Sequence, residues 1–285
     1  MSESLIWTDI TAKIIAATKP TKYAHNGLVT FEVVMPYFAW CEIVTHKRLA
    51  RNAMSHRAAG VKRFAALGFY KPTFHGVGSG MDAADALSDE LQAAAQHIWE
   101  ETGTRTLQAI QELLDIGVCK SEALRLLPAN HMVKGVLTGT EDAWIKVLEL
   151  RDHPAADPAM QLLAKQIADS IHDIDSNGTW QYGGWHVPYA APSDVTTETC
   201  LQAAACIARV SYGSTESRDS DLALAERLKV SKHLSPFEHI AKATAMRELP
   251  AAHDEIPRSA LLSKNADVDR GFGWVNYRSV LETQG

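Results

Sequence analysis

The 285-residue chain lacks several features that define special classes of protein. It holds only four cysteines, at positions 41, 119, 200 and 206, and no two of them form a C-x-x-C pair. This scatter argues against both a disulfide framework and a cysteine-ligated zinc site, so we expect reduced and mostly buried thiols. Glycine and proline number only 17 and 11, while 46% of residues are hydrophobic, which excludes collagen-like and largely disordered chains.

Long hydrophobic runs are also absent. No stretch approaches the roughly 18 consecutive apolar residues that a membrane-spanning helix needs. The first twenty residues show neither a basic head followed by an apolar run nor a small-residue cleavage site. We therefore expect a cytoplasmic protein with no membrane partner.

The chain has no overall excess of positive charge. Its formal net charge of −6 makes broad binding to a nucleic-acid backbone improbable, so we expect no nucleic-acid partner. Residues 45–63 are the exception, because they contain six lysines or arginines, two histidines and no carboxylate. Such a segment is either a solvated face or a pocket for a small phosphorylated ligand.

The length of the chain suits one large domain or two small ones, and hydrophobic patterning predicts mixed helices and strands. A β-branched run at 28–35 predicts a strand that Pro36 closes. An uninterrupted stretch at 37–56, with apolar residues at helical spacing, predicts one helix with Lys47, Arg51 and Ser55 on a polar stripe. Helical structure is also expected at 88–116, as one or two helices broken by Gly103. Further helices are expected at 119–127, 140–150, 158–174, 197–211 and 219–230, with a loop at 177–192 and a mobile segment at 251–269. Thr140 is the expected cap of its helix, with Glu141 and Asp142 in the first turn.

Four separated segments together resemble the flavin-dependent thymidylate synthases. THK at 45–47, followed after seven residues by Ser55, is similar to the R-H-R-x7-S motif of that family. ARVSY at 208–212 and HLSPFEH at 233–239 resemble its A-R-V-S-[FY] and H-x-[ST]-P-F-E-H strings, and the stretch 125–151 resembles its R-x-x-L-P…L-x-L-R segment. In ordinary members the two strings precede the R-H-R motif, whereas here they follow it. This order resembles the permuted arrangement of phage-type members. The resemblance implies a single domain over residues 1–285 with an α+β fold, in which helices flank an antiparallel sheet.

The resemblance also implies a reaction. Methylating uracil at C5 needs a carrier of a one-carbon unit and a hydride, which side chains cannot supply. The family implies FAD as cofactor, with NADPH and methylenetetrahydrofolate as co-substrates and dUMP as the nucleotide that becomes dTMP. Methylation of UMP and hydroxymethylation of dUMP are alternatives within the same chemistry.

Residue by residue, the resemblance assigns two sets of side chains. Arginine forks suit both a phosphate and the edge of a uracil ring. The implied substrate residues are Glu42, Ser55, Arg57, Arg125 and Arg151, among which Arg151 and Ser55 would act in catalysis. The implied flavin residues are Thr45, His46, Lys47, Asn52, Ser211, His233, Ser235 and Glu238. No metal is expected, since His233 and His239 are six positions apart with a proline between them and cannot share a helical face.

Several positions depart from the family pattern. Thr45 and Lys47 replace arginines, Ala53 replaces a glutamate, and Glu42 stands where glutamine is common. Thr140, Asp142 and Lys146 occupy positions of Asn, Arg and Asn near the flavin. These changes leave a second hypothesis open, in which the chain is a degenerate relative that binds nucleotides without catalysis.

Family members are homotetramers whose active sites combine several chains, so the resemblance implies the same assembly here. It also implies direct flavin chemistry without an enzyme nucleophile. None of the four cysteines lies in a recognised motif or a setting that would activate a thiolate, which agrees with that mechanism.

Overall fold

The computed structural model describes residues 6–22, 24–78, 85–175, 180–181, 184–190, 195–213, 217–245 and 272–283. The segment expected to be mobile, 251–269, lies outside these residues, as does part of the expected loop 177–192. Among the described helices, none combines the length and the apolar character needed to cross a membrane.

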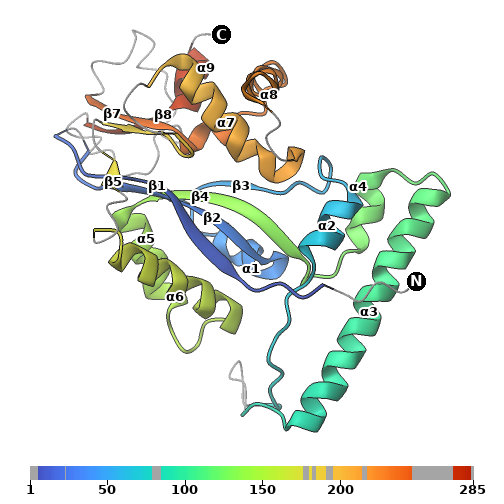
Figure 1. The fold of residues 1–285 in the computed structure, drawn as a ribbon. Helices are drawn as coiled ribbons and strands as arrows, with labels where there is room; N and C mark the ends of the chain where they lie inside the picture. The colour runs from blue at the N-terminus through green and yellow to red at the C-terminus, as the bar shows by residue number, and fades with distance from the viewer. Residues whose placement is uncertain are drawn as a thin grey trace.

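A five-stranded sheet forms the centre of the molecule (Figure 1). Its strands, in the order β3-β4-β2-β1-β5, are β3 (Ala50–Ala53), β4 (Met132–Thr140), β2 (Leu28–Pro36), β1 (Thr11–Thr18) and β5 (Trp180–Gln181). All neighbours are antiparallel except β1 and β5. The central pair β2 and β4 is mostly buried on both faces, which explains why the sequence of β2 is almost continuously apolar.

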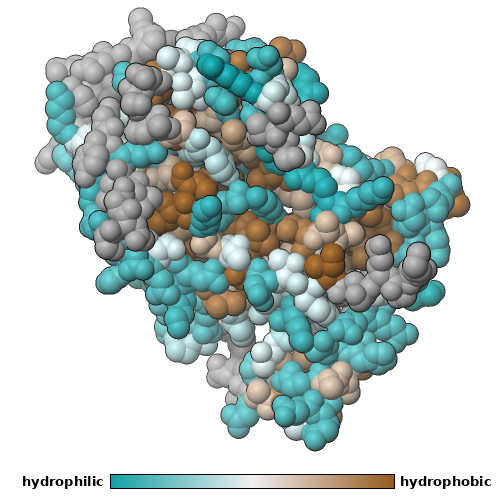
Figure 2. Space-filling view, in the orientation of Figure 1, coloured by the Kyte–Doolittle hydropathy of each residue, from teal (hydrophilic) through white to brown (hydrophobic). Residues whose placement is uncertain are grey.

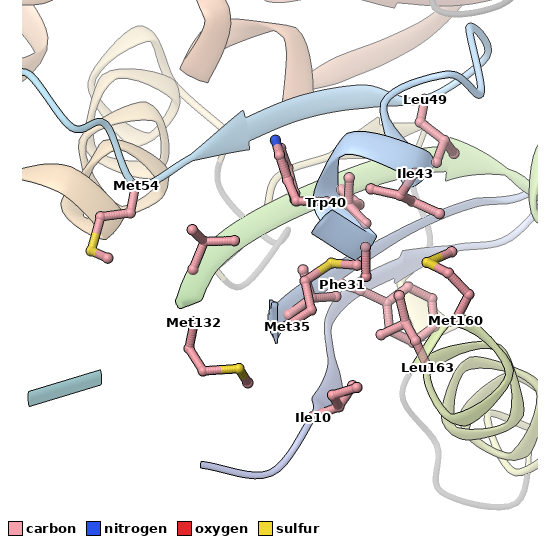
Figure 3. Close-up of a cluster of buried hydrophobic side chains, with 14 of the residues drawn as sticks. Ile10, Phe31, Met35, Trp40, Ile43, Leu49, Met54, Met132, Met160 and Leu163 are labelled. Carbon is pink, nitrogen blue, oxygen red and sulfur yellow. The ribbon is translucent and has the colours of Figure 1, made fainter. Parts of the chain in front are cut away.

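Helices cover the lower face of this sheet in Figure 1. They are α1 (Tyr37–Ile43), α5 (Glu141–Arg151) and α6 (Pro158–His172). Phe31 and Met35 of β2 pack in the buried cluster with Trp40 and Ile43 of α1 and Leu163 of α6, as Figure 3 shows. Thr140 caps α5 by accepting a hydrogen bond from the Ala143 amide, as the sequence predicts.

The upper part of Figure 1 holds the C-terminal elements. These are α7 (Thr197–Tyr212), α8 (Arg218–Val230), the 3-10 helix η3 (Ser235–His239), α9 (Tyr277–Thr283) and a three-stranded sheet of β6 (Trp185–His186), β7 (Ala241–Ala245) and β8 (Phe272–Asn276). They enclose a separate apolar cluster that includes Phe237 and Tyr277. The expected α+β class, with an antiparallel sheet and flanking helices, is confirmed.

A third group of elements lies at the right in Figure 1, beyond the end of the sheet where β3 finishes and β4 begins. It contains α2 (Val61–Leu67), the long α3 (Asp89–Asp115), α4 (Lys120–Ala123) and the 3-10 turn η1 (Leu124–Leu126). Helix α3 continues through Gly103, which is buried, so the expected break at this glycine does not occur.

The single helix expected at 37–56 is wrong beyond Ile43. The chain turns after Ile43, and residues 50–53 form edge strand β3, paired with β4 from Ala50↔Thr138 to Ala53↔Gly135. Tertiary pairing overrides the helical spacing here, because β4 offers an unpaired edge. Lys47, Arg51 and Ser55 therefore do not form one helical stripe.

Two smaller expectations also change. The segment 177–192 contains the short strands β5 and β6 rather than loop alone. The four thiols are all free: Cys200 is buried, Cys206 is half-buried, and Cys41 in α1 and Cys119 just before α4 are exposed. Burial raises the pKa of the Cys200 thiol to about 12.

Candidate active site

Three of the segments that resemble family motifs lie far apart in the sequence but meet at strand β3. The Ser55 amide donates to Ser211 Oγ of α7 at 2.9 Å. Asn52 Nδ2 donates to the Ile207 carbonyl at 3.1 Å, and Ser235 Oγ of η3 donates to Asn52 Oδ1 at 3.2 Å. These bonds place the 208–212 and 233–239 strings against the 45–57 segment, which is the proximity that a permuted chain requires.

A cavity of about 590 Å³ lies at this junction, and we call it the β3 cavity. Ligand sites for small molecules typically span roughly 300–1,000 Å³. Six of the residues predicted from the sequence line the β3 cavity: Asn52, Ser55, Arg57, Ser211, His233 and Ser235. Its remaining lining comes from Arg51, Ala53, Ala58, Ala208, Tyr212, Leu228 and Pro236.

The η3 helix fixes one wall of the β3 cavity. Pro236 stands in its first turn, where a missing amide hydrogen costs nothing. Ser235 and Pro236 face the cavity, while Phe237 and His239 are fully buried on the other side. Glu238, expected at the flavin, does not line the cavity and instead forms an ion pair with Arg278 of α9.

A second cavity, of about 560 Å³, shares Arg57 with the first. We call it the Arg125 cavity, since Arg125 of η1 contributes a second guanidinium to its wall. Its other lining residues are Tyr37, His56, Ser121, Leu124, Leu127 and His131. The predicted substrate residues Arg57 and Arg125 thus border one space, in which two cations favour an anionic ligand.

Glu42, His46 and Arg151 form a third cluster. Arg151, the last residue of α5, donates from Nη1 to Glu42 Oε2 at 2.6 Å and from Nε to His46 Nε2 at 3.1 Å. His46 accepts this bond, so it is neutral with its hydrogen on Nδ1. Burial, and secondarily the charge of Arg151, lowers the pKa of His46, which keeps the ring neutral. None of the three residues lines either cavity among the described residues.

The remaining predicted residues lie on the surface. Thr45 and Lys47 are exposed in the turn before β3, and Thr45 Oγ1 donates to the Glu42 carbonyl at 2.7 Å. Asp142, in the first turn of α5, forms an ion pair with Arg48, with Oδ2 and Nη1 3.8 Å apart. Lys146, further along the same helix, forms an ion pair with Glu149. The departures at these positions therefore have local contacts of their own.

Sequence reasoning missed several residues that border the cavities. Arg51 lies in the cationic segment, which was the available signal, but its place in the β3 cavity depends on the strand that replaces the expected helix. Tyr37, His56, Ser121 and His131 carried no motif. They come together only because α1, the turn after β3, α4 and the start of β4 converge.

Comparison with known proteins assigns the family. A sequence model of the thymidylate synthase complementing protein family matches residues 11–175, which is more than half of the chain. The chain belongs to this family. It is accordingly a thymidylate synthase-like methyltransferase, and the match includes the 45–57 segment, Arg125 and Arg151.

Solved structures show a weaker likeness. Two crystal structures of the UMP/dUMP methylase PolB from Streptomyces cacaoi, bound with 5-Br dUMP and 5-Br UMP, are 16% and 17% identical to the chain, with TM-scores of 0.48 and 0.49. They cover 61% and 62% of this chain and 92% and 93% of their own. Similarity at this level does not by itself establish a shared fold. No curated protein matches the chain.

Proposed function

We propose that this member of the thymidylate synthase complementing protein family methylates dUMP at C5, with FAD as cofactor and methylenetetrahydrofolate and NADPH as co-substrates. The observation that carries the proposal is the pair of cavities that meet at Arg57. The β3 cavity has the size and polar lining for part of a flavin nucleotide. The Arg125 cavity has the paired cations that suit a nucleotide phosphate.

The residues of the β3 cavity fit a flavin. Arg51 and Arg57 offer cationic donors, and Asn52, Ser211, Ser235 and His233 offer neutral hydrogen-bonding groups, beside the apolar Leu228 and Pro236. This mixture suits a ligand with both a diphosphate and a polar-edged ring system. FAD, when bound, supplies the hydride and one-carbon chemistry that side chains lack.

In the Arg125 cavity, Arg57 and Arg125 would hold the phosphate of dUMP. A bidentate guanidinium contact fixes both the position and the orientation of a phosphate. Ser55 lines the neighbouring β3 cavity, and its Oγ accepts from the Arg57 amide at 3.2 Å, so it steadies the turn that carries Arg57. We assign Ser55 to ligand contact rather than to nucleophilic attack.

Arg151 would polarise the uracil ring, since a fixed cation stabilises the negative charge that develops on the ring as C5 reacts. Its bonds to Glu42 and His46 use two of its five N–H donors and hold the guanidinium in place. The other donors are available to a ligand. Glu42 thus contributes by orienting Arg151.

We further propose a homotetramer in which Arg151 of one copy completes the cavities of another. The separation of the Arg151 cluster from both cavities supports this arrangement. Figure 2 adds support, because hydrophobic side chains gather across the middle of the face it shows, over the central sheet. Contiguous apolar surface of this kind is typical of protein–protein contacts.

Flavin content and product identity test the proposal. Purified protein should be yellow with FAD and convert dUMP to dTMP when methylenetetrahydrofolate and NADPH are present. Parallel reactions with UMP, analysed by mass spectrometry, distinguish the ribonucleotide and hydroxymethyl alternatives. A colourless protein that binds dUMP but transforms neither nucleotide, even after incubation with FAD, would favour the degenerate, non-catalytic relative.

A further inference from the structure

His56 and His131 form a hydrogen-bonded pair in the wall of the Arg125 cavity. Their Nε2 atoms are 3.0 Å apart, and His131 Nδ1 lies 2.7 Å from the Pro128 carbonyl oxygen. Tyr37 stacks on His131 with ring centroids 5.0 Å apart, and Phe64 stacks on His56 at 4.8 Å. The pair is therefore held both by hydrogen bonds and by aromatic packing.

The contacts determine where the hydrogens lie. A carbonyl oxygen only accepts, so His131 carries its hydrogen on Nδ1 and has a bare Nε2 when neutral. His56 must then donate from Nε2, which leaves His56 Nδ1 as a bare nitrogen without a hydrogen bond among the described residues. Burial lowers the pKa of His131 to about 4 and also lowers that of His56, so both rings are neutral near pH 7.

The surroundings of His56 are cationic or neutral. Arg57 follows it in the chain, and Arg125 of η1 lines the same cavity. Tyr37 of α1 and Ser121 of α4 also border the cavity, and Lys120 donates to the nearby Ala58 carbonyl. No carboxylate lines the described cavity. Positive neighbours oppose a third positive charge in the empty cavity, but a bound dianion reverses that balance.

We propose that the His56–His131 pair makes phosphate binding in the Arg125 cavity proton-linked: His56 takes up a proton at Nδ1 as a dianionic phosphate monoester binds. The proton turns Nδ1 from an acceptor into a charged donor toward the phosphate, while Nε2–H continues to donate to His131. His131 acts as a positioning residue, since its bond to Pro128 fixes the tautomer of His56. This proposal rests on the proposed function for the identity of the nucleotide, but not for the anion itself.

Titration calorimetry tests the proposal by counting protons. At pH 7.5, dUMP binding measured in two buffers of different ionisation enthalpy should show uptake of between about half and one proton per nucleotide. Inorganic sulfate should show the same uptake, and because sulfate stays a dianion at this pH, the proton must go to the protein. Deoxyuridine, which has no phosphate, should show none.

Two variants assign the proton. His56→Gln should abolish uptake for dUMP and sulfate, and should weaken dUMP about tenfold at pH 6.5 but less at pH 8. His131→Phe keeps an aromatic ring against Tyr37 and should reduce uptake without changing deoxyuridine binding. The exposed His172, which pairs with Asp173 at the end of α6, provides the control His172→Gln, which should behave as wild type.

Proton uptake that persists in folded His56→Gln, or sulfate binding without uptake in the wild type, would overturn the proposal. Failure of dUMP to bind the wild type would count against the proposed function instead. In that case the sulfate titration still decides whether binding of a dianion is coupled to His56.

Discussion

His186 and His239 are joined by one buried hydrogen-bonded chain through the central sheet. His239 Nδ1 is 2.8 Å from Thr138 Oγ1, Thr138 Oγ1 is 2.6 Å from Thr30 Oγ1, and Thr30 Oγ1 is 2.6 Å from His186 Nε2. His186 Nδ1 then contacts Thr18 Oγ1 at 2.8 Å. The chain joins η3 and β6 to strands β4, β2 and β1, so it ties the C-terminal elements to the central sheet.

The direction of the chain follows from its two ends. Thr18 donates to the Trp185 carbonyl, so it accepts from His186 Nδ1. Thr30 then donates to His186 Nε2, Thr138 donates to Thr30, and His239 Nδ1 donates to Thr138. Within this hydrogen-bonded chain, His239 Nε2 is buried and has no partner among the described residues, and this direction makes it a bare acceptor. The opposite direction would leave a buried N–H donor without a partner. Both histidines are thus neutral in the folded protein.

The first prediction is acid sensitivity. Burial lowers the folded-state pKa of His186 and of His239 to about 3, against an unfolded value of 6.5. The unfolded chain therefore binds more protons than the folded protein below pH 6.5. The stability that the two neutral histidines contribute is present above pH 6.5 and is lost as the pH falls toward 3. We expect the free energy of unfolding to fall by about 1.4 kcal/mol per pH unit for each histidine in this range.

Urea denaturation between pH 8 and pH 4 measures this loss. The double variant His186→Gln/His239→Gln removes both titrating rings, so it should be less stable at pH 8 but should have a flatter stability profile below pH 6.5. An equally steep decline in this variant would show that other groups cause the acid sensitivity.

The second prediction concerns Arg51. Together with Arg57 it supplies the guanidinium groups of the β3 cavity, whereas Thr45 and Lys47, at the motif positions, are exposed. Arg51→Met should weaken FAD about tenfold or more, because a charge-assisted contact to the diphosphate is lost, while riboflavin binding should change little. Flavin fluorescence measures both affinities. The control is Arg48→Met, because Arg48 pairs with Asp142 outside the cavity. If Arg51→Met weakened the binding of FAD and riboflavin equally, Arg51 would not contact a diphosphate.

The third prediction concerns the division of the site between copies of the chain. Arg151→Ala should cost roughly 3–4 kcal/mol of transition-state stabilisation, and Arg57→Ala should primarily weaken nucleotide binding. If one copy supplies Arg151 and another supplies Arg57, co-expression of the two variants with different affinity tags should produce hybrid oligomers with partial activity. Hybrids as inactive as either parent, or a flavin-bound monomer in light scattering, would contradict the shared site.

The fourth prediction concerns the cysteines. Cys200 is buried with a raised pKa, and no cysteine lines either cavity, although Cys119 Sγ lies 3.3 Å from Ser121 Oγ at the edge of the Arg125 cavity. A folded, flavin-loaded variant with all four cysteines replaced by Ala or Ser should keep activity within about an order of magnitude. Mass spectrometry of the wild type with a 5-fluorinated nucleotide should detect no cysteine adduct; loss of turnover in Cys119→Ser alone would require a thiol in the mechanism.

The sequence predicted much of this architecture because its signals are local. The cap at Thr140, the charges in the first turn of α5 and the proline after the first predicted strand each act within a few residues, and those elements form as expected. The helix expected at 37–56 fails because the fate of residues 50–53 depends on β4, which lies more than 80 positions away and supplies their partners.

The candidate site likewise contains residues that the sequence indicates and residues whose placement depends on long-range contacts. Motif resemblance assigned Asn52, Ser211 and Ser235 to the flavin and Ser55 to the substrate, and all four line the β3 cavity. Their roles toward those ligands stay predictions. Arg51 depends on strand formation, and the His56–His131 pair depends on a turn that meets the start of β4, so neither leaves a sequence pattern. In the proposed tetramer Arg151 would join them from a second copy, an arrangement that no pattern within one chain encodes.

Substitution at C5 is the central claim, and release of tritium from dUMP labelled at that carbon tests it most directly. We predict that the FAD-loaded protein releases tritium only when methylenetetrahydrofolate and NADPH are both present, with the folate carbon recovered in dTMP. Folded, FAD-loaded protein that binds dUMP but releases no tritium from dUMP or UMP under these conditions would contradict the account.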